Sequence, residues 1–167
     1  MATANTFVQI GSTVTVGSGG AANIDFTSIP ATYTDLVVKI STRCSTTTTA
    51  GTVSFNGSGS NFTGIRLYGD GASATSGSST SAILTNDSSY TASTFANSEI
   101  YIPNYASANY KSVSIDGVSE TNATTAYAML NAILWSNTAA INQVTITPAG
   151  GNFVQYSTAS LYGILKY

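Results

Sequence analysis

The side chains that could do acid–base chemistry in this chain are its seven carboxylates, because the sequence contains no histidine. A glycosidase would need two of them across a cleft, one with a raised pKa. Three stand instead in turn-like contexts: Asp70 lies between two glycines, Asp87 follows an asparagine, and Asp116 precedes a glycine. Turn carboxylates usually accept hydrogen bonds from nearby backbone N–H groups. We therefore expect structural roles for these carboxylates and no catalytic residues.

Metal and cofactor sites have weak sequence support. Asp70 or Asp87 with loop carbonyls could bind calcium, but no closely spaced pair of aspartates is present. Cys44, the single cysteine, follows a basic residue but has no neighbouring acid–base partner, which favours an inert thiol. The glycine-rich residues 17–20 precede neither a lysine nor a helical pattern, so they do not predict a phosphate-binding loop. The sequence predicts no metal and no cofactor.

The composition sets the surface chemistry. Of the 167 residues, five are Lys or Arg and seven are Asp or Glu, which is 7% charged against ~25% in an average domain. Serine and threonine contribute 24 and 26 residues. The net charge of -2 does not suit nucleic-acid binding, which needs several phosphate contacts. A hydrophobic fraction of 43% argues against disorder. The N-terminus has no basic region and no apolar core, so no signal peptide is expected. No run approaches the ~18 apolar residues of a membrane span, so no membrane contact is predicted.

Alternation of polar and apolar residues predicts strands along the whole chain. Leu36, Val38 and Ile40 share one face of a half-buried strand. In residues 62–68 we expect Ile65 and Leu67 to point inward, and the arginine and tyrosine that follow them to point outward. Residues 126–135 fit a helix or a buried strand, and we favour the strand by analogy with the rest of the chain.

Turn signals separate these strands. Asn56-Gly57 predicts a tight hairpin, and Asp116-Gly117 predicts a turn or a bulge. Residues 69–81 are small and polar and predict a long exposed loop. The result is an all-β chain, an antiparallel β-sandwich or jelly-roll-like domain of nine or ten short strands. Residues 1–20 form an N-terminal strand or docking arm, and residues 21–167 form the single sandwich domain.

The end of the chain carries apolar residues on both strand faces. Leu161 and Leu165 share one face, while Tyr162 and Ile164 share the other. Burial on both faces implies a central strand or a contact between copies.

Tyrosine is abundant, with ten residues. Most are expected to pack against neighbouring strands, while Tyr68 and Tyr105 are candidate ligand contacts because tyrosine rings on loops can stack on sugars.

A surface of hydroxyls and amides favours dense, permanent packing, because neutral groups cost less to desolvate than charges do. The segments 28–38 (SIPATYTDLVV), 54–57 (SFNG) and 65–71 (IRLYGDG) resemble segments of structural proteins of tailed bacteriophage particles. Residues 151–153 (GNF) and 157–164 (STASLYGI) are similar to the C-terminal strands of those proteins. This resemblance implies a small β-sandwich carried on the virion, as a head decoration or as part of a fibre or tail appendage.

The leading hypothesis is therefore a non-enzymatic capsid decoration or cement protein on the virion exterior, assembled in the bacterial host cytoplasm. Its expected partners are the major capsid protein and copies of itself, as a homotrimer on the icosahedral lattice. The interface residues we expect fall in two groups, namely Phe7, Val8 and Ile10 for docking the N-terminal arm, and Leu161, Tyr162 and Ile164 for packing between copies.

The alternative is a tail-fibre or head-fibre module that binds host-surface glycans. Residues 69–81 and 101–110 would then present tyrosine and hydroxyl groups, including Tyr105, to a polysaccharide.

Overall fold

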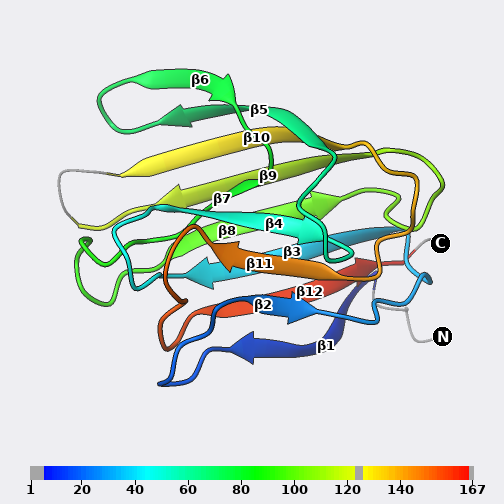
Figure 1. Cartoon of the computed structure of the whole chain (residues 1–167), viewed down its shortest axis with the longest axis horizontal. Helices are drawn as coiled ribbons and strands as arrows, with labels where there is room; N and C mark the ends of the chain where they lie inside the picture. Colours follow the sequence, from blue (N-terminus) through cyan, green and yellow to red (C-terminus); the bar gives the residue numbers. More distant parts are fainter. Residues whose placement is uncertain (1–5, 123–125, 166–167) are drawn as a thin grey trace.

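A computed structural model describes residues 6–122 and 126–165 and contains twelve strands in that part of the chain (Figure 1). Within these ranges there is no helix long and apolar enough to cross a lipid bilayer. In chain order the strands are β1 (Phe7–Thr15), β2 (Ile24–Phe26), β3 (Asp35–Thr42), β4 (Ala50–Phe55), β5 (Phe62–Gly69), β6 (Ala74–Ser78), β7 (Ala82–Leu84), β8 (Ala96–Ile102), β9 (Lys111–Ser119), β10 (Tyr127–Trp135), β11 (Val144–Pro148) and β12 (Thr158–Ile164).

The strands form two antiparallel sheets, so the predicted all-β, sandwich-like fold is confirmed with more strands than expected. The larger sheet has the order β1-β12-β3-β8-β9-β10-β5-β6, and the smaller has the order β2-β11-β4-β7. Figure 1 shows the smaller sheet lying over the β12-to-β9 part of the larger one, while β10, β5 and β6 extend beyond it at the top. One end of the larger sheet is therefore left without a covering sheet.

The core fills the space between the sheets. Leu36, Val38 and Ile40 are all buried on the inner face of β3, as their alternation predicts. Facing them, the smaller sheet contributes buried apolar residues from all four of its strands, including Ile24, Val53, Ile83 and Val144. The apolar residues of alternating strands thus bury one face of each sheet, which is the main stabilising term of the fold.

Two local predictions are confirmed in detail. Residues 127–135 form β10, a strand paired on both sides, with β9 and β5. Asn56 and Gly57 have φ values of 52° and 73°, and Phe55 and Ser58 on either side exchange backbone hydrogen bonds of 3.2 and 3.0 Å. Two positive φ values in a two-residue loop define the tight hairpin that this dipeptide favours.

The N-terminal segment is part of the larger sheet. β1 pairs with β12 along its length, with a register shift between Ile10 and Val14. Gly11, at a φ of 70°, lies in this irregular stretch, a conformation that suits glycine. β12 in turn lies between β1 and β3. Its inner face is buried at Ala159 and Leu161, while Tyr162 and Ile164 on its outer face are only half-buried.

Two predictions about turns are wrong. The composition of residues 69–81 predicts a long exposed loop. The segment is exposed, but it contains the edge strand β6, which pairs with β5 from Ile65↔Ser78 to Gly69↔Ala74. Asp116-Gly117 is neither a turn nor a bulge, because β9 runs straight through it. A Cβ on Gly117 would lie 2.7 Å from the Ser98 hydroxyl and 3.3 Å from Leu84. The glycine is there to let β7 approach the larger sheet.

Candidate functional site

The orientation of β5 decides which chemistry the molecule presents. Phe62 at its start is buried against Phe55 and Trp135. Because side chains alternate along a strand, the two large aliphatic residues that follow, Ile65 and Leu67, point away from the core and are 64% and 55% exposed. The prediction that these two point inward is therefore wrong, and the whole of β5 is reversed relative to it.

Exposed aliphatic side chains gather on the outer face of the larger sheet at this end. They come from three adjacent strands and are called here the apolar face: Ile65, Leu67, Val118, Leu130 and Leu134. Leu130 stands directly opposite Leu67 in the β10–β5 register, with alanines at neighbouring positions. Contiguous exposed apolar surface of this kind typically marks an interaction site.

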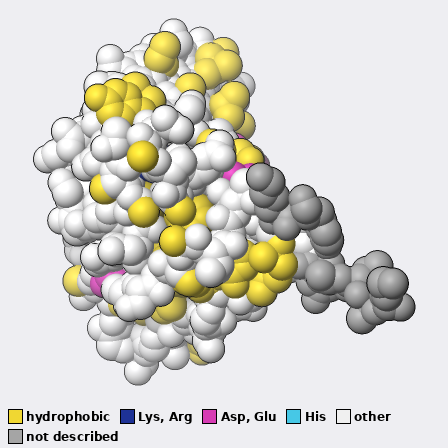
Figure 2. Space-filling view, turned by 90° about the vertical axis from the view of Figure 1, so that its right-hand side faces the viewer, with side chains coloured by type: hydrophobic (Ala, Val, Ile, Leu, Met, Phe, Trp, Pro, Cys, Tyr) yellow, Lys and Arg dark blue, Asp and Glu magenta, His cyan; other side chains and the backbone are white. Residues whose placement is uncertain are grey.

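The rest of the surface is polar and nearly uncharged. In the view of Figure 2, neutral polar atoms cover most of the molecule and charge is confined to small areas, while hydrophobic side chains gather towards the top, where β5, β6 and β10 lie, and again in a patch in the lower half. The neutral groups around the apolar face would be cheap to desolvate in a contact with another protein.

A charged row borders the apolar face on the same outer surface. Lys39, Glu99 and Asp116 are successive cross-strand neighbours on β3, β8 and β9, and Lys39 forms an ion pair with Glu99. The next partner along the row is Leu130, opposite Asp116. The outer surface therefore changes from charged to aliphatic between β9 and β10.

The six predicted interface residues do not form one surface. Phe7 is 46% exposed and stacks on half-buried Tyr162, with ring centroids 4.8 Å apart, and Ile164 pairs with Phe7 on the same outer face. Val8 and Ile10 are on the opposite, inner face of β1, where Ile10 packs against the core. Leu161 is 1% exposed and belongs to the core, so its prediction as an intermolecular contact is wrong.

The two tyrosines predicted as ligand contacts differ in their exposure to solvent. Tyr105 is fully buried, because its ring packs in the core and its hydroxyl donates to the Pro30 carbonyl and accepts from the Tyr33 N–H. It cannot reach a ligand at the surface, and that prediction is wrong. Tyr68 is partly exposed and lines a cleft between the two sheets.

Three tyrosines have phenols that ionise less readily than a free side chain. Burial raises the pKa of Tyr90, Tyr101 and Tyr105, and a hydrogen bond to Asp35 adds to the effect at Tyr101. A phenol whose pKa is raised in the folded state stabilises the fold at pH values below about 10, the pKa of tyrosine in the unfolded chain. This stabilisation is lost as the pH rises through the folded pKa.

We therefore expect the melting temperature to fall as pH rises above about 10. Circular dichroism melts across the alkaline range would measure this fall. The variant Tyr101→Phe should reduce it, while Tyr110→Phe, at a tyrosine that is 59% exposed, should leave it unchanged. A melting temperature that stays constant while the phenols ionise would contradict the expectation.

The carboxylates predicted to stabilise turns behave in two ways. Asp70 accepts hydrogen bonds from the backbone N–H groups of Ala72 and Ser73, which hold its pKa below the ordinary value. Asp87 accepts from the Ser89 N–H in the same manner. Asp116 lies in a strand instead, which corrects its assignment to a turn. Among the described residues no group of three or more metal-ligating side chains of the His, Cys, Asp and Glu types comes together.

Comparison with known proteins finds no matching family model, no similar curated protein and no similar solved structure.

Proposed function

We propose that the chain is a non-enzymatic structural protein of a bacteriophage virion, which decorates the exterior of the capsid and stabilises the shell by packing. The observation that carries the proposal is the apolar face, where five large aliphatic side chains from β5, β9 and β10 stand exposed. The hydroxyl-rich, nearly uncharged composition supports it, as does the resemblance of several segments within residues 28–164 to phage structural proteins.

Two separate contact surfaces fit a subunit that meets both its siblings and a shell. The apolar face lies at the β5–β10 end of the larger sheet, while Phe7, Tyr162 and Ile164 lie at its β1–β12 end. The charged row on β3, β8 and β9 separates the two. We assign the apolar face to a neighbouring copy, with a closed trimer as the expected assembly, and the β1–β12 end to the major capsid protein.

Changing both Leu67 and Leu130 to serine should weaken this self-association. Each side chain is about half exposed, so burying the exposed part contributes about 1 kcal/mol, and two of them correspond to a ~30-fold weaker association. Sedimentation velocity over a range of protein concentrations would measure the change.

The matched control is Tyr156→Ser, which removes an exposed ring that is outside the apolar face and 68% exposed. It should associate as the unchanged protein does. A protein that stays monomeric at all concentrations, or a double variant that associates normally, would contradict the role assigned to the apolar face.

The capsid role itself is tested by adding the protein to shells that lack it. Bound protein should raise the temperature at which the shells release their contents, and Phe7→Ser should weaken binding to the shell. Shells that gain no resistance to heat or dilution would exclude a cementing function.

A further inference from the structure

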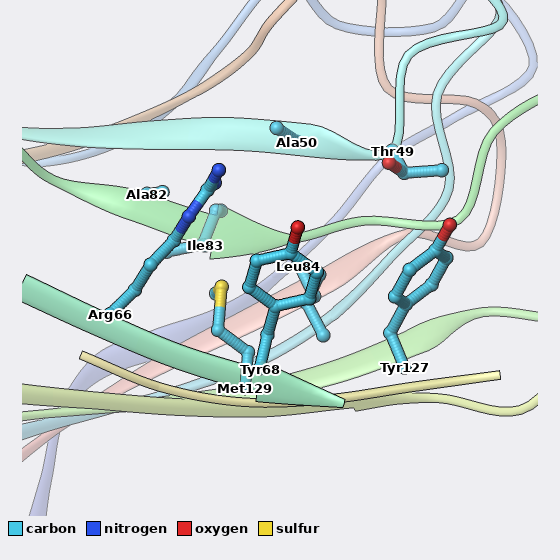
Figure 3. A pocket seen from close by; sticks show the side chains of 9 residues that line it. All are labelled: Thr49, Ala50, Arg66, Tyr68, Ala82, Ile83, Leu84, Tyr127 and Met129. Carbon is cyan, nitrogen blue, oxygen red and sulfur yellow. The ribbon is translucent and has the colours of Figure 1, made fainter. Parts of the chain in front are cut away.

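A cleft opens where the smaller sheet ends and the larger sheet continues beyond it. Its volume is about 230 Å³, and its walls come from β4 and β7 on one side and from β5 and β10 on the other. Arg66, Tyr68 and Tyr127 extend from the larger sheet in the same direction, toward β4 and Thr49 (Figure 3). The reversed orientation of β5 is what brings these polar side chains inside while the aliphatic residues point out.

Arg66 is the one cation of the described residues that lacks a hydrogen-bond acceptor. Lys39 pairs with Glu99, and Lys111 and Arg43 donate to several backbone carbonyls. Arg66 instead has its guanidinium 5.0 Å from the centre of the Tyr68 ring, and its Nε is buried without a partner. Its planar fork of N–H donors is thus available in the cleft, and the nearest fitting acceptor chemistry is a carboxylate.

A second unsatisfied polar group lies beside the arginine. Asn131 is fully buried and directly opposite Arg66 in the β10–β5 register. Its amide N–H donates to the Ala82 carbonyl at 3.0 Å, while its Oδ1 has no partner. Buried polar groups without partners are rare in folded proteins. A donor and an acceptor left unsatisfied on paired residues indicate that this end of the sheet is built around polar contacts that the described chain does not supply.

The remaining walls combine aromatic rings, hydroxyls and an apolar floor. Tyr68 and Tyr127 present rings and hydroxyl groups, with Leu84 between them and Met129 between Tyr68 and Arg66 (Figure 3). The Tyr90 phenol lies close to the side chains of Tyr127 and Thr49. Aromatic and apolar surface with a few placed polar groups is typical of small-molecule sites, and the volume here is below the ~300–1,000 Å³ of drug-sized pockets.

We propose that this cleft binds a single sugar residue that carries a carboxylate, such as a uronic acid within an acidic polysaccharide. The carboxylate would accept a bidentate pair of hydrogen bonds from Arg66. The apolar C–H face of the ring would pack on Tyr68, and the ring hydroxyls would bond to the Tyr127 and Thr49 hydroxyls. The aromatic and hydroxyl walls distinguish a sugar from a bare anion, which would use the arginine alone. The proposal does not depend on the capsid role, because the cleft is on the opposite side of the sheet from the apolar face.

Calorimetric titration at low salt with three probes would test it: sodium glucuronate, glucose and inorganic phosphate. Glucuronate should bind at least ~10-fold more tightly than either glucose, which lacks the charge, or phosphate, which lacks the ring. Arg66→Gln should lower the glucuronate affinity ~10-fold or more, to the level of glucose, and Tyr68→Ala should weaken glucuronate binding as well.

Lys39→Gln is the matched control, because it removes a cation from the outer face of the same sheet and should leave glucuronate binding unchanged. Arg66 has no hydrogen-bond acceptor or ion-pair partner within the described chain and only stacks on Tyr68, so the glutamine variant should keep a melting temperature close to that of the unchanged protein, and Arg66→Lys gives a second variant of intermediate affinity. Equal binding of glucuronate by the unchanged protein and the glutamine variant would overturn the proposal. Phosphate binding as tight as glucuronate binding would also overturn it, since the site would then be a simple anion site.

Discussion

Replacing Trp135 by alanine is expected to cost the fold ~3–5 kcal/mol, a large part of the ~5–15 kcal/mol that a domain of this size has. Trp135 is 1% exposed and packs edge-on against Phe55 at 5.4 Å between ring centres, with Phe62 at 6.4 Å. Its indole N–H has no hydrogen-bond partner among the described residues, so the loss is one of packing. Urea unfolding followed by circular dichroism measures it, because the variant lacks the chain's single tryptophan.

Leu134→Ala is the control on the same strand. Leu134 precedes the tryptophan, points to the outer face and is 38% exposed, so its truncation should cost less than about 1 kcal/mol. The pair therefore tests which face of β10 is buried. If the leucine variant lost as much stability as the tryptophan variant, the orientation of β10, and with it the apolar face, would be wrong.

Alternation in the sequence predicts which residues share a face of a strand, but not which face is covered. In β3 the aliphatic face is also the covered face, because Val38 and its aliphatic neighbours pack against the smaller sheet. In β5 it is not, because Phe62 takes the inner face and leaves Ile65 and Leu67 on the outer face, which the smaller sheet does not cover. Which face of β5 meets the second sheet is a tertiary property, and no local pattern in 62–68 contains it.

Local chemistry is the part of the fold that the sequence predicts best. The Asn56-Gly57 hairpin and the Asp70 turn depend on side chains within a few residues, and both form as expected. Gly117 and Tyr105 illustrate the opposite case. A glycine is needed at 117 because Leu84 packs closely against it, and Tyr105 is held in the core by its hydrogen bond to Pro30. Both contacts join distant parts of the chain, and sequence spacing does not reveal them.

The cleft could have been suspected from one signal in the sequence. Arg66 is an arginine within an alternating strand of a chain that is only 7% charged, and a charged group that leaves water is costly unless it meets a partner. Tyr68, two residues away on the same face, was predicted as a ligand contact and does line the cleft. Tyr127 and Thr49 come from distant segments, so their part in the site follows only from the sheet order.

Lys111→Met is expected to lower the free energy of unfolding at neutral pH by ~2–3 kcal/mol. Lys111 is 1% exposed, and its ammonium donates to the carbonyls of Ser107 and Ala139 at 2.8 and 2.6 Å, with the Trp135 ring at 5.4 Å. Methionine keeps the apolar stem and removes the donors that hold these two loops together. Urea unfolding at neutral pH measures the loss, and Lys39→Met, at an exposed ion pair, should cost less than ~1 kcal/mol.

The same lysine gives the stability a pH dependence of known sign. Burial lowers the pKa of Lys111 in the folded protein below the ordinary value of 10.5. Between the lowered pKa and that value the unfolded chain binds more protons, so the folded state gains stability as pH rises through this window. The Lys111→Met variant lacks that gain, and the difference in unfolding free energy between the two proteins should widen toward pH ~10. A difference that stays constant or narrows over the window would show that the ammonium is held by its carbonyls strongly enough to offset its burial.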